Sequence, residues 1–164
     1  MILYKNLYVC RTDFFMEIRK ATLSDIDHIV PLFDGYRLFY RQSSDIEAAR
    51  TFIKNRLERE ESIIYIAFSK DEPQRAIGFT QLYPIFSSVS MEKMLLLNDL
   101  FIDPKYRGSG AGTALINKAK ERCQDTNQKG LVIQTETTNP AQKLYEHLGF
   151  KKDPDLHYFW SAQS

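Results

Sequence analysis

Residues 107–112 read Arg-Gly-Ser-Gly-Ala-Gly and join an apolar run, MLLLNDLFI (94–102), to an amphipathic run that begins near residue 110. The first turn of a helix leaves backbone N–H groups without intrahelical acceptors, and the helix dipole adds partial positive charge there. Glycines permit positive φ and let a ligand approach the backbone closely. Arg107 can add a charge-assisted contact. The stretch therefore predicts a diphosphate held by main-chain amides.

The spacing of the glycines excludes the two commonest phosphate loops. A Walker loop ends in GK[ST], whereas Gly112 is followed by Thr113 and Ala114. A dinucleotide fingerprint needs G-x-G-x-x-G near a first strand. Counting from Gly108 the sixth position is Thr113, and three predicted strands come before the strand that leads into the loop. A glycine-rich turn that only caps a helix is the structural alternative.

The elements around this loop follow from hydrophobic periodicity and turn residues. We predict strands at 17–22, 62–69, 75–86, 94–102, 130–137 and 157–162, and helices at about 24–40, 43–60, 110–124 and 139–149. Pro31 is expected to break or kink the first helix. Strands come first as a meander and then alternate with helices, which indicates an α/β domain with a mixed sheet.

Composition narrows the class of protein. A chain of 164 residues with 43% hydrophobic and 26% charged residues is typical of one soluble domain. The net charge of +1 argues against a nucleic-acid partner. Cys10 and Cys123 lie far apart in the sequence without a CxxC or His-rich motif, so we expect no disulfide framework, no metal site and a reducing, cytoplasmic location.

The N-terminal segment is apolar but interrupted. Charged and polar residues break it often enough that we expect no signal-peptide core and no membrane span. A natural domain start is Met16, which gives a single domain over 16–164. Residues 1–15 are then either an N-terminal extension or an artefact of expression or of the assigned start.

Two motifs resemble a known family. RGSGAG after LFIDPKY is similar to motif A, [QR]-x-x-G-x-[GA], of the GNAT superfamily of acetyl-CoA-dependent N-acyltransferases. NPAQKLYEHLGF (139–150) resembles its motif B, and the order of elements agrees from about 17 to 161. Within the superfamily, NDLFIDP and DGYRLFY (34–40) are most similar to the histone/polyamine and diamine acetyltransferase branch.

The resemblance implies a fold and a cofactor site. The fold would be α/β (α+β), a GNAT fold with a central mixed twisted sheet of six to seven strands, a V-shaped splay between strands 4 and 5, and about four flanking helices. The cofactor would be acetyl-CoA (coenzyme A), with its pantetheine arm along strand 94–102. Asn139 would contact this arm, although it can equally cap the helix before Pro140. The implied cofactor-binding residues are Leu100, Phe101, Ile102, Arg107, Gly108, Ser109, Gly110, Ala111, Gly112 and Asn139.

Acetyl transfer to an amine needs a proton acceptor and a proton donor. A lysine-like amine with a pKa near 10.4 is almost fully protonated at pH 7, and the departing thiolate needs an acid. The motif match places Tyr145 in the acid role. Some diamine-type relatives carry a glutamate at the position of Asn98, so our candidate base is Asp99, acting through water, with Glu136 second. The alternative is that Asp99 is structural and binds loop backbone.

Aromatic side chains could receive the acceptor. Tyr36, Phe39 and Tyr40 cluster on the first helical segment, with Tyr83 and Phe86 expected across the cleft. Aromatic rings suit alkylammonium chains through cation–π contacts. A plain hydrophobic core explains them equally well. We take Tyr36, Tyr40 and Tyr83 as candidate substrate residues.

The sequence thus predicts an N-acetyltransferase that moves an acetyl group from acetyl-CoA directly to a primary amine. The acceptor would be a polyamine, a lysine side chain or another protein amine, or a small-molecule amine, with neither nucleic acid nor membrane as partner. The resemblance is also compatible with a homodimer. The alternative is a non-catalytic acyl-CoA-binding sensor module.

Overall fold

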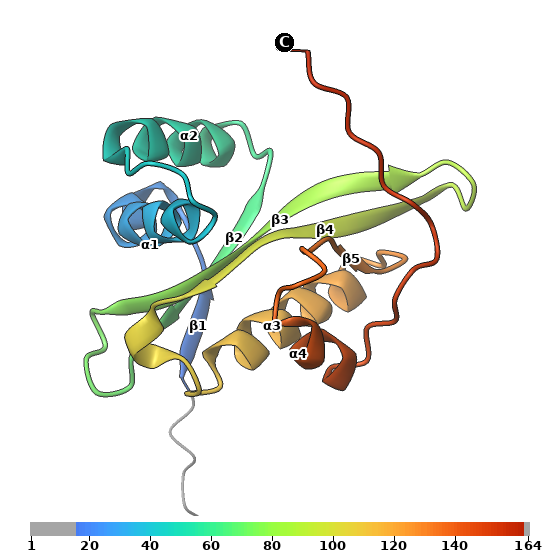
Figure 1. The fold of residues 1–164 in the computed structure, drawn as a ribbon. Helices are drawn as coiled ribbons and strands as arrows, with labels where there is room; N and C mark the ends of the chain where they lie inside the picture. Colours follow the sequence, from blue (N-terminus) through green and yellow to red (C-terminus); the bar gives the residue numbers. More distant parts are fainter. Residues whose placement is uncertain (1–15, 163–164) are drawn as a thin grey trace, which may run out of the picture. The chain divides into compact units, whose positions relative to one another are not determined.

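The computed structural model describes residues 16–162, which divide into two compact units at Ile133 and Gln134 (Figure 1). Each unit is described by itself, and the prediction for residues 1–15 lies outside the described residues. No helix in the described range is long and apolar enough to span a bilayer. The elements are β1 (Glu17–Lys20), η1 (Leu23–Asp25), α1 (Ile26–Phe39), α2 (Ile46–Glu58), β2 (Ile63–Phe68), β3 (Ala76–Ser87), β4 (Glu92–Ile102), η2 (Pro104–Tyr106), α3 (Ala111–Asp125), β5 (Leu131–Ile133) and, in the second unit, α4 (Gln142–His147).

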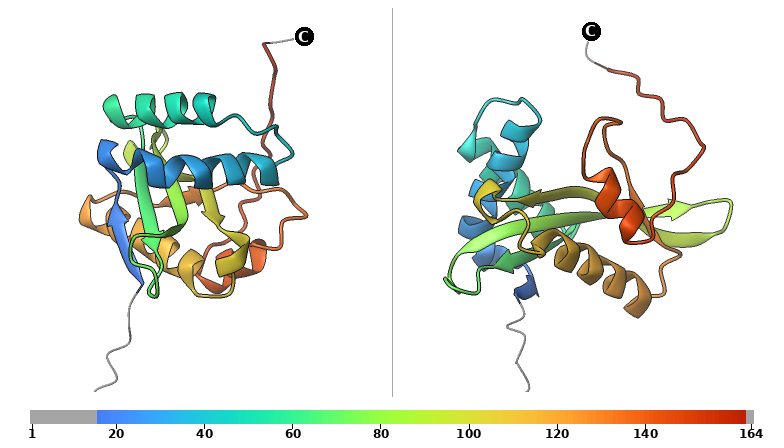
Figure 2. Two further views of the ribbon diagram at one scale, coloured as in Figure 1. Left: turned by 90° about the vertical axis from the view of Figure 1, so that its left-hand side faces the viewer. Right: turned by 60° about the horizontal axis from the view of Figure 1, so that its bottom comes forward.

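The first unit is built on a mixed sheet with strand order β1-β2-β3-β4-β5. The pairs from β1 to β4 are antiparallel, and β5 runs parallel to β4. Helices α1 and α2 cover one face of the sheet, and α3 covers the other (Figure 2). The meander followed by a crossover through α3 confirms the predicted α/β order.

The number of strands is lower than predicted. The described residues form five strands rather than six or seven, because residues 157–162 form no strand. β5 is also shorter than predicted, at three residues instead of eight. Tyr158, Phe159 and Trp160 are each more than 80% exposed. Their β-propensity is high, but a strand exists only where its backbone groups find a pairing partner.

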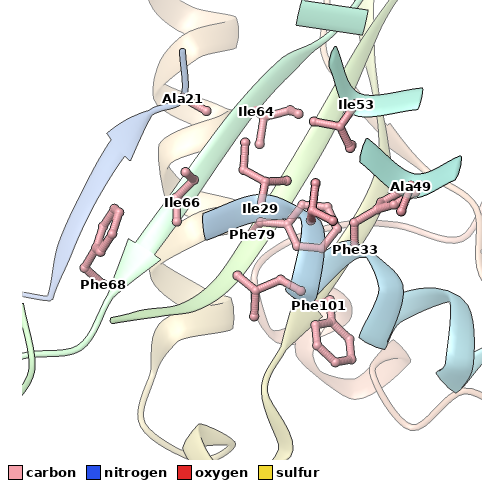
Figure 3. Packing of buried hydrophobic residues seen from close by; sticks show 12 residues of the cluster. Ala21, Ile29, Phe33, Ala49, Ile53, Ile64, Ile66, Phe68, Phe79 and Phe101 are labelled. Carbon is pink, nitrogen blue, oxygen red and sulfur yellow. The ribbon is translucent and has the colours of Figure 1, made fainter. Parts of the chain in front are cut away.

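The core of the first unit lies between the sheet and the first two helices (Figure 3). Alternate residues of β2 supply one side, Ile64 and Ile66, both fully buried. Phe33 of α1 stacks on Phe52 of α2 with ring centroids 5.5 Å apart and meets Phe79 of β3 at 6.2 Å. These contacts fix α1 against the middle of the sheet.

Pro31 does not break α1, so of the expected break or kink the break is wrong. The helix is continuous from Ile26 to Phe39, and Pro31 lies on its exposed side. A proline removes one backbone hydrogen bond. Burial of its neighbours Val30 and Leu32 against the sheet offsets that loss.

Gly35 sets how closely α1 approaches β4. A Cβ atom at this position would lie 3.0 Å from Cζ and 3.1 Å from Cε1 of the Phe101 ring. Because the ring is itself buried in the core, it has little room to move. Gly35 therefore brings the next residue, Tyr36, against β4.

Replacing Gly35 with valine is expected to destabilise the fold by about 1–3 kcal/mol, the usual cost of overpacking a core. The matched control is Gly130→Val, since a Cβ atom there meets nothing within 4 Å. Urea unfolding of both variants tests this. Equal stability of the two variants would contradict the close approach of α1 to β4.

Candidate active site

The glycine loop forms the entrance to α3. Gly108 and Gly110 have φ of 79° and 86°, and Gly110 is the N-terminal cap residue of the helix. A Cβ atom at either position would meet nothing within 4 Å, so the space beside each glycine is open. Residues 107–110 are exposed, whereas the side chain of Ala111 is buried.

The amides of this loop are available to an anion. Among the described residues, no acceptor meets the backbone N–H groups of Gly108, Gly110, Ala111 and Gly112, and the first helical bond runs from the N–H of Ala114 to the carbonyl of Gly110, at 3.0 Å. The first turn of α3 carries no acidic residue. The positive end of a 15-residue helix dipole is therefore unopposed there.

Arg107 is placed at the edge of the loop. Its Nε donates to the carbonyl of Ile102 at 3.4 Å, and its guanidinium lies 5.7 Å from the ring centroid of Phe39. Both contacts are with exposed or half-exposed groups, which leaves the charge in solvent beside the loop. The structure thus places an arginine where it can reach an anion held by the amides.

The last part of β4 leaves one edge without a strand. β5 pairs with β4 only from Leu95 to Leu97, and β4 then continues to Ile102 with β3 as its partner. No described strand pairs with the opposite edge of residues 98–102. An extended ligand can add to such an edge as a strand would.

A β-bulge at Asn98 changes the direction of the β4 side chains. Gln81 pairs with Asp99 and Leu82 pairs with Leu97, so Asn98 has no residue opposite it. Such a bulge inserts one residue and shifts the alternation. As a result, Asp99 shares the α1 face of the sheet with Gln81, and Leu97 lies with Leu82 on the α3 face. Asn98 is exposed.

Asp99 is the centre of a buried polar network. Its side chain is 3% exposed. Gln81 Nε2 donates to its Oδ2 at 2.7 Å, Asn98 Nδ2 donates to its Oδ1 at 3.0 Å, and the Tyr36 hydroxyl also donates to it. These partners are side chains, whereas the structural alternative expected the Asp99 side chain to bind loop backbone.

Gln81 links Asp99 to two further groups. Its Nε2 also donates to the Tyr83 hydroxyl at 2.8 Å, and its Oε1 accepts from the Ser62 hydroxyl at 3.0 Å. Gln81 is fully buried. Every polar atom of its amide therefore has a partner, and its orientation is fixed.

The environment changes the acidity of two groups in the network. Burial raises the pKa of the Asp99 carboxyl above its usual value, and hydrogen bonds from Gln81, Tyr36 and Asn98 offset part of that rise. Burial, with a smaller contribution from the charge of Asp99, raises the pKa of Tyr83 to about 12. A carboxylate with a raised pKa is a stronger proton acceptor than an exposed one.

The three candidate substrate residues all lie in the first unit, and two of them reach Asp99. Tyr36 bonds to it and Tyr83 reaches it through Gln81. The Tyr40 ring packs edge-on against Tyr36 at 5.0 Å. Phe86 is 73% exposed near the end of β3.

The motif B residues lie in the second unit. Tyr145 is half-buried on α4, with its ring 6.1 Å from that of Phe150. Asn139 Oδ1 accepts from the N–H of Ala141 at 2.9 Å, in the turn before α4. The N-terminal cap residue of α4 is Ala141, and no side chain caps it, so the alternative in which Asn139 caps this helix is wrong. Glu136 does not lie on a strand as predicted, because β5 ends at Ile133.

Sequence reasoning missed Gln81 and Ser62. The signal for Gln81 was present, since a glutamine in the apolar strand RAIGFTQLYPIF is as conspicuous as Asn98 and Asp99 in MLLLNDLFI. A buried polar group needs partners. Ser62 precedes β2 and carries no comparable signal.

Comparisons with known proteins identify the family of this chain. Residues 29–150 match the model of the Acetyltransferase (GNAT) family. A Bacillus subtilis (strain 168) protein described as an uncharacterized N-acetyltransferase, YhfO, is 49% identical over 145 residues, which cover 87% of this chain and 95% of that protein. A probable acetyltransferase of Haemophilus influenzae is 33% identical over 144 residues, 88% of this chain and 96% of that protein.

A solved structure shows the same fold. The crystal structure of a probable acetyltransferase superposes with a TM-score of 0.83 at 37% identity, over 91% of this chain and 99% of that one. The matched region of the family model includes the Asp99 network, the glycine loop and the helix of Tyr145. The chain therefore belongs to the Acetyltransferase (GNAT) family and is an N-acetyltransferase.

Proposed function

We propose that this enzyme transfers an acetyl group from acetyl-CoA directly to a primary amine. The observation that carries the proposal is the entrance of α3, where amides without acceptors, positive φ and an unopposed helix dipole coincide. This arrangement suits a pyrophosphate. The open edge of β4 next to it suits the pantetheine arm of the same molecule.

The residues present fit the cofactor. The amides of residues 107–112 would hold the pyrophosphate, with Arg107 adding charge, and the backbone of Leu100 and Ile102 would bind the pantetheine. Phe101 lies between them, so its N–H and C=O face β3, and its side chain is buried in the core. Asn139 Oδ1 accepts from the N–H of Ala141, so its side-chain N–H groups would supply the donors for the contact expected from motif B.

The chemistry requires the removal of a proton from the amine. Acetyl-CoA supplies the acetyl group as a thioester, which only an uncharged amine attacks. At pH 7 the protonation of a lysine-like amine is a handicap of about 4–5 kcal/mol. Asp99 accepts this proton in our proposal, since burial raises the pKa of its carboxyl and three donors hold it in place.

The free cysteine of the described residues is unsuited to form an acyl-enzyme, which agrees with direct transfer. The free cysteine there, Cys123, is buried in α3, and burial raises the pKa of its thiol. A thiol of this kind is a poor nucleophile. An acyl-enzyme on this residue is therefore not part of the proposal.

Tyr145 is proposed as the acid that protonates the departing thiolate, on the strength of the motif B match. Tyr145→Phe keeps the ring that packs on Phe150 and removes the hydroxyl. We expect kcat to fall about tenfold to a hundredfold, because a thiolate needs less help than a stronger base would. The dissociation constant of CoA, measured by calorimetry, should change little. Comparable losses in both quantities would contradict the acid role.

The acceptor is proposed to be an alkylamine that lies along aromatic side chains. Tyr36, Tyr40 and Tyr83 are grouped around the base, and rings of this kind bind alkylammonium chains. A polyamine, a protein lysine or N-terminus, and a small-molecule amine all satisfy this requirement. The similarity of NDLFIDP and DGYRLFY to the histone/polyamine and diamine branch favours polyamines in the test. A cytoplasmic location and a homodimer remain predictions.

Release of the CoA thiol tests the proposed function. Wild-type protein is mixed with acetyl-CoA and, separately, with spermidine, a lysine peptide with a blocked N-terminus, a peptide with a free N-terminus, and an aminoglycoside. We expect amine-dependent thiol release with at least one acceptor. Tight CoA binding without release for any amine would contradict the proposal and favour the non-catalytic sensor.

A further inference from the structure

Asp99 has no direct access to solvent. Its side chain is 3% exposed, with Gln81 on one carboxylate oxygen, Asn98 on the other, and Tyr36 over it from α1. An amine that approaches from solvent therefore cannot touch the carboxylate. The proton has to pass through one of the groups already bonded to Asp99 or through water beside them.

Only one of these three partners can pass a proton on. Gln81 and Asn98 present amide N–H groups, which donate hydrogen bonds but do not exchange a proton with a carboxylate at ordinary pH. Tyr36 presents a hydroxyl, which can accept a proton on its oxygen while it gives up its own. Gln81 is also fully buried, whereas Tyr36 is half-exposed.

The position of Tyr36 is fixed by packing on several sides. Its ring lies 6.3 Å from Phe33, 6.2 Å from Phe79 and 5.0 Å from Tyr40. Its hydroxyl oxygen lies 3.4 Å from the carbonyl oxygen of Asn98, so it reaches β4 at the bulge itself. The side chain thus extends from the core to the edge of β4 that no described strand covers.

The rest of the network holds Asp99 for this contact. The single amide nitrogen of Gln81 bonds both Asp99 and Tyr83, and Ser62 fixes the other end of that amide. The carboxylate therefore cannot rotate away from Tyr36 without leaving Gln81 unpaired in the core. Tyr83 stays a neutral hydroxyl, since its pKa is raised to about 12.

We propose that Tyr36 is a further catalytic residue, a proton relay between the acceptor amine and Asp99. The proton on the amine nitrogen passes to the Tyr36 hydroxyl oxygen, and the proton already on that oxygen passes to an Asp99 carboxylate oxygen. The amine loses one proton, Asp99 gains one, and Tyr36 is unchanged. The inference rests on the proposed function, because it assumes that Asp99 is the base.

The test compares Tyr36→Phe with wild type and with a matched control. The variant keeps the packed ring and removes only the hydroxyl. Tyr65→Phe is the control, because Tyr65 alternates with Ile64 and Ile66 and so lies on the opposite, α3 face of the sheet. The acceptor is the amine from the panel of four that wild type turns over fastest. Thiol release gives kcat/KM from pH 6 to pH 10, and the melting temperature reports folding.

We expect kcat/KM of Tyr36→Phe to fall about tenfold or more near pH 7. The loss should shrink toward pH 10, where the free amine needs no base. Tyr36→Phe combined with Asp99→Asn should be no worse than Asp99→Asn alone, because the two residues act in one path. Tyr65→Phe should match wild type.

Three results separate the possible failures. No thiol release by wild type overturns the proposed function, and the relay with it. Full activity of Asp99→Asn overturns the base, and the relay with it. An Asp99→Asn defect together with a Tyr36→Phe variant that is fully active, equally impaired at every pH, or additive with Asp99→Asn overturns the relay alone.

Discussion

Asp99→Asn is expected to lower kcat about 100- to 1000-fold at pH 7, within the usual range for loss of a general base. Asparagine has the size of aspartate, and its Oδ1 can still accept from Gln81, but its amide cannot take a proton from the amine. The loss should be smaller at high pH, where more of the acceptor is already neutral. Initial rates of thiol release at several pH values give the result.

Asp34→Asn is the matched control. Asp34 is also a buried carboxyl of the first unit, but hydrogen bonds from the Ser44 hydroxyl and the N–H of Asp45 lower its pKa. Its role is to fix the connection between α1 and α2, so its loss should reduce the melting temperature and leave kcat of the folded protein close to wild type. Equal effects of the two substitutions on kcat would contradict a base role for Asp99.

The stability of the Asp99 variant should depend on pH in a definite direction. The pKa of Asp99 is raised in the folded protein, so the folded state binds more protons than the unfolded chain between the two pKa values. The free energy of unfolding of wild type, relative to Asp99→Asn, is therefore greatest below the unfolded pKa of about 3.9. It declines as the pH rises through the folded pKa. Urea unfolding at a series of pH values measures this difference, and a constant or rising difference would mean that the pKa is not raised.

Gly110→Val is expected to raise the dissociation constant of acetyl-CoA about 100-fold. Gly110 has φ of 86° and an open space where a Cβ atom would stand. In our account the pyrophosphate occupies that space, so a branched side chain there displaces it from two or more amides. Each charge-assisted bond is worth about 1.5–3 kcal/mol, and 1.4 kcal/mol is tenfold in affinity. Calorimetric titration with acetyl-CoA measures the change.

Gly149→Val separates this effect from backbone strain. Gly149 has nearly the same φ, 87°, and a Cβ atom there also meets nothing within 4 Å. Valine at positive φ should cost about 1–3 kcal/mol of stability at either position. Only Gly110→Val should lose cofactor affinity by two orders of magnitude. Unchanged affinity in that variant would place the pyrophosphate elsewhere.

Much of the fold was predictable because its local signals agree with its tertiary contacts. The amphipathic stripe of residues 43–60 became α2, and the glycines before the next amphipathic run became the entrance of α3. The loop could be found because glycine at positive φ before a helix is a property of the local chain. Asp99 could be found because a carboxylate in an apolar strand needs partners.

Other features depend on pairing and could not be predicted. The bulge at Asn98 is set by the register of β3 against β4, and it decides that Asp99 faces α1. Strand length is likewise a property of the partner, so β5 stopped at Ile133, and the aromatic run around Trp160 formed no strand. Pro31 lies inside a helix because burial of its two neighbours, Val30 and Leu32, outweighs the loss of one backbone hydrogen bond.

The central claim is that the main chain of residues 107–112 holds the pyrophosphate of coenzyme A. Titration of ¹⁵N-labelled protein with CoA, followed by amide proton and nitrogen shifts, tests it most directly. We predict that the largest shifts are those of Gly108, Gly110, Ala111 and Gly112, and that pantetheine without the pyrophosphate leaves these four nearly unmoved. Binding of CoA with these four amides unshifted would contradict the account.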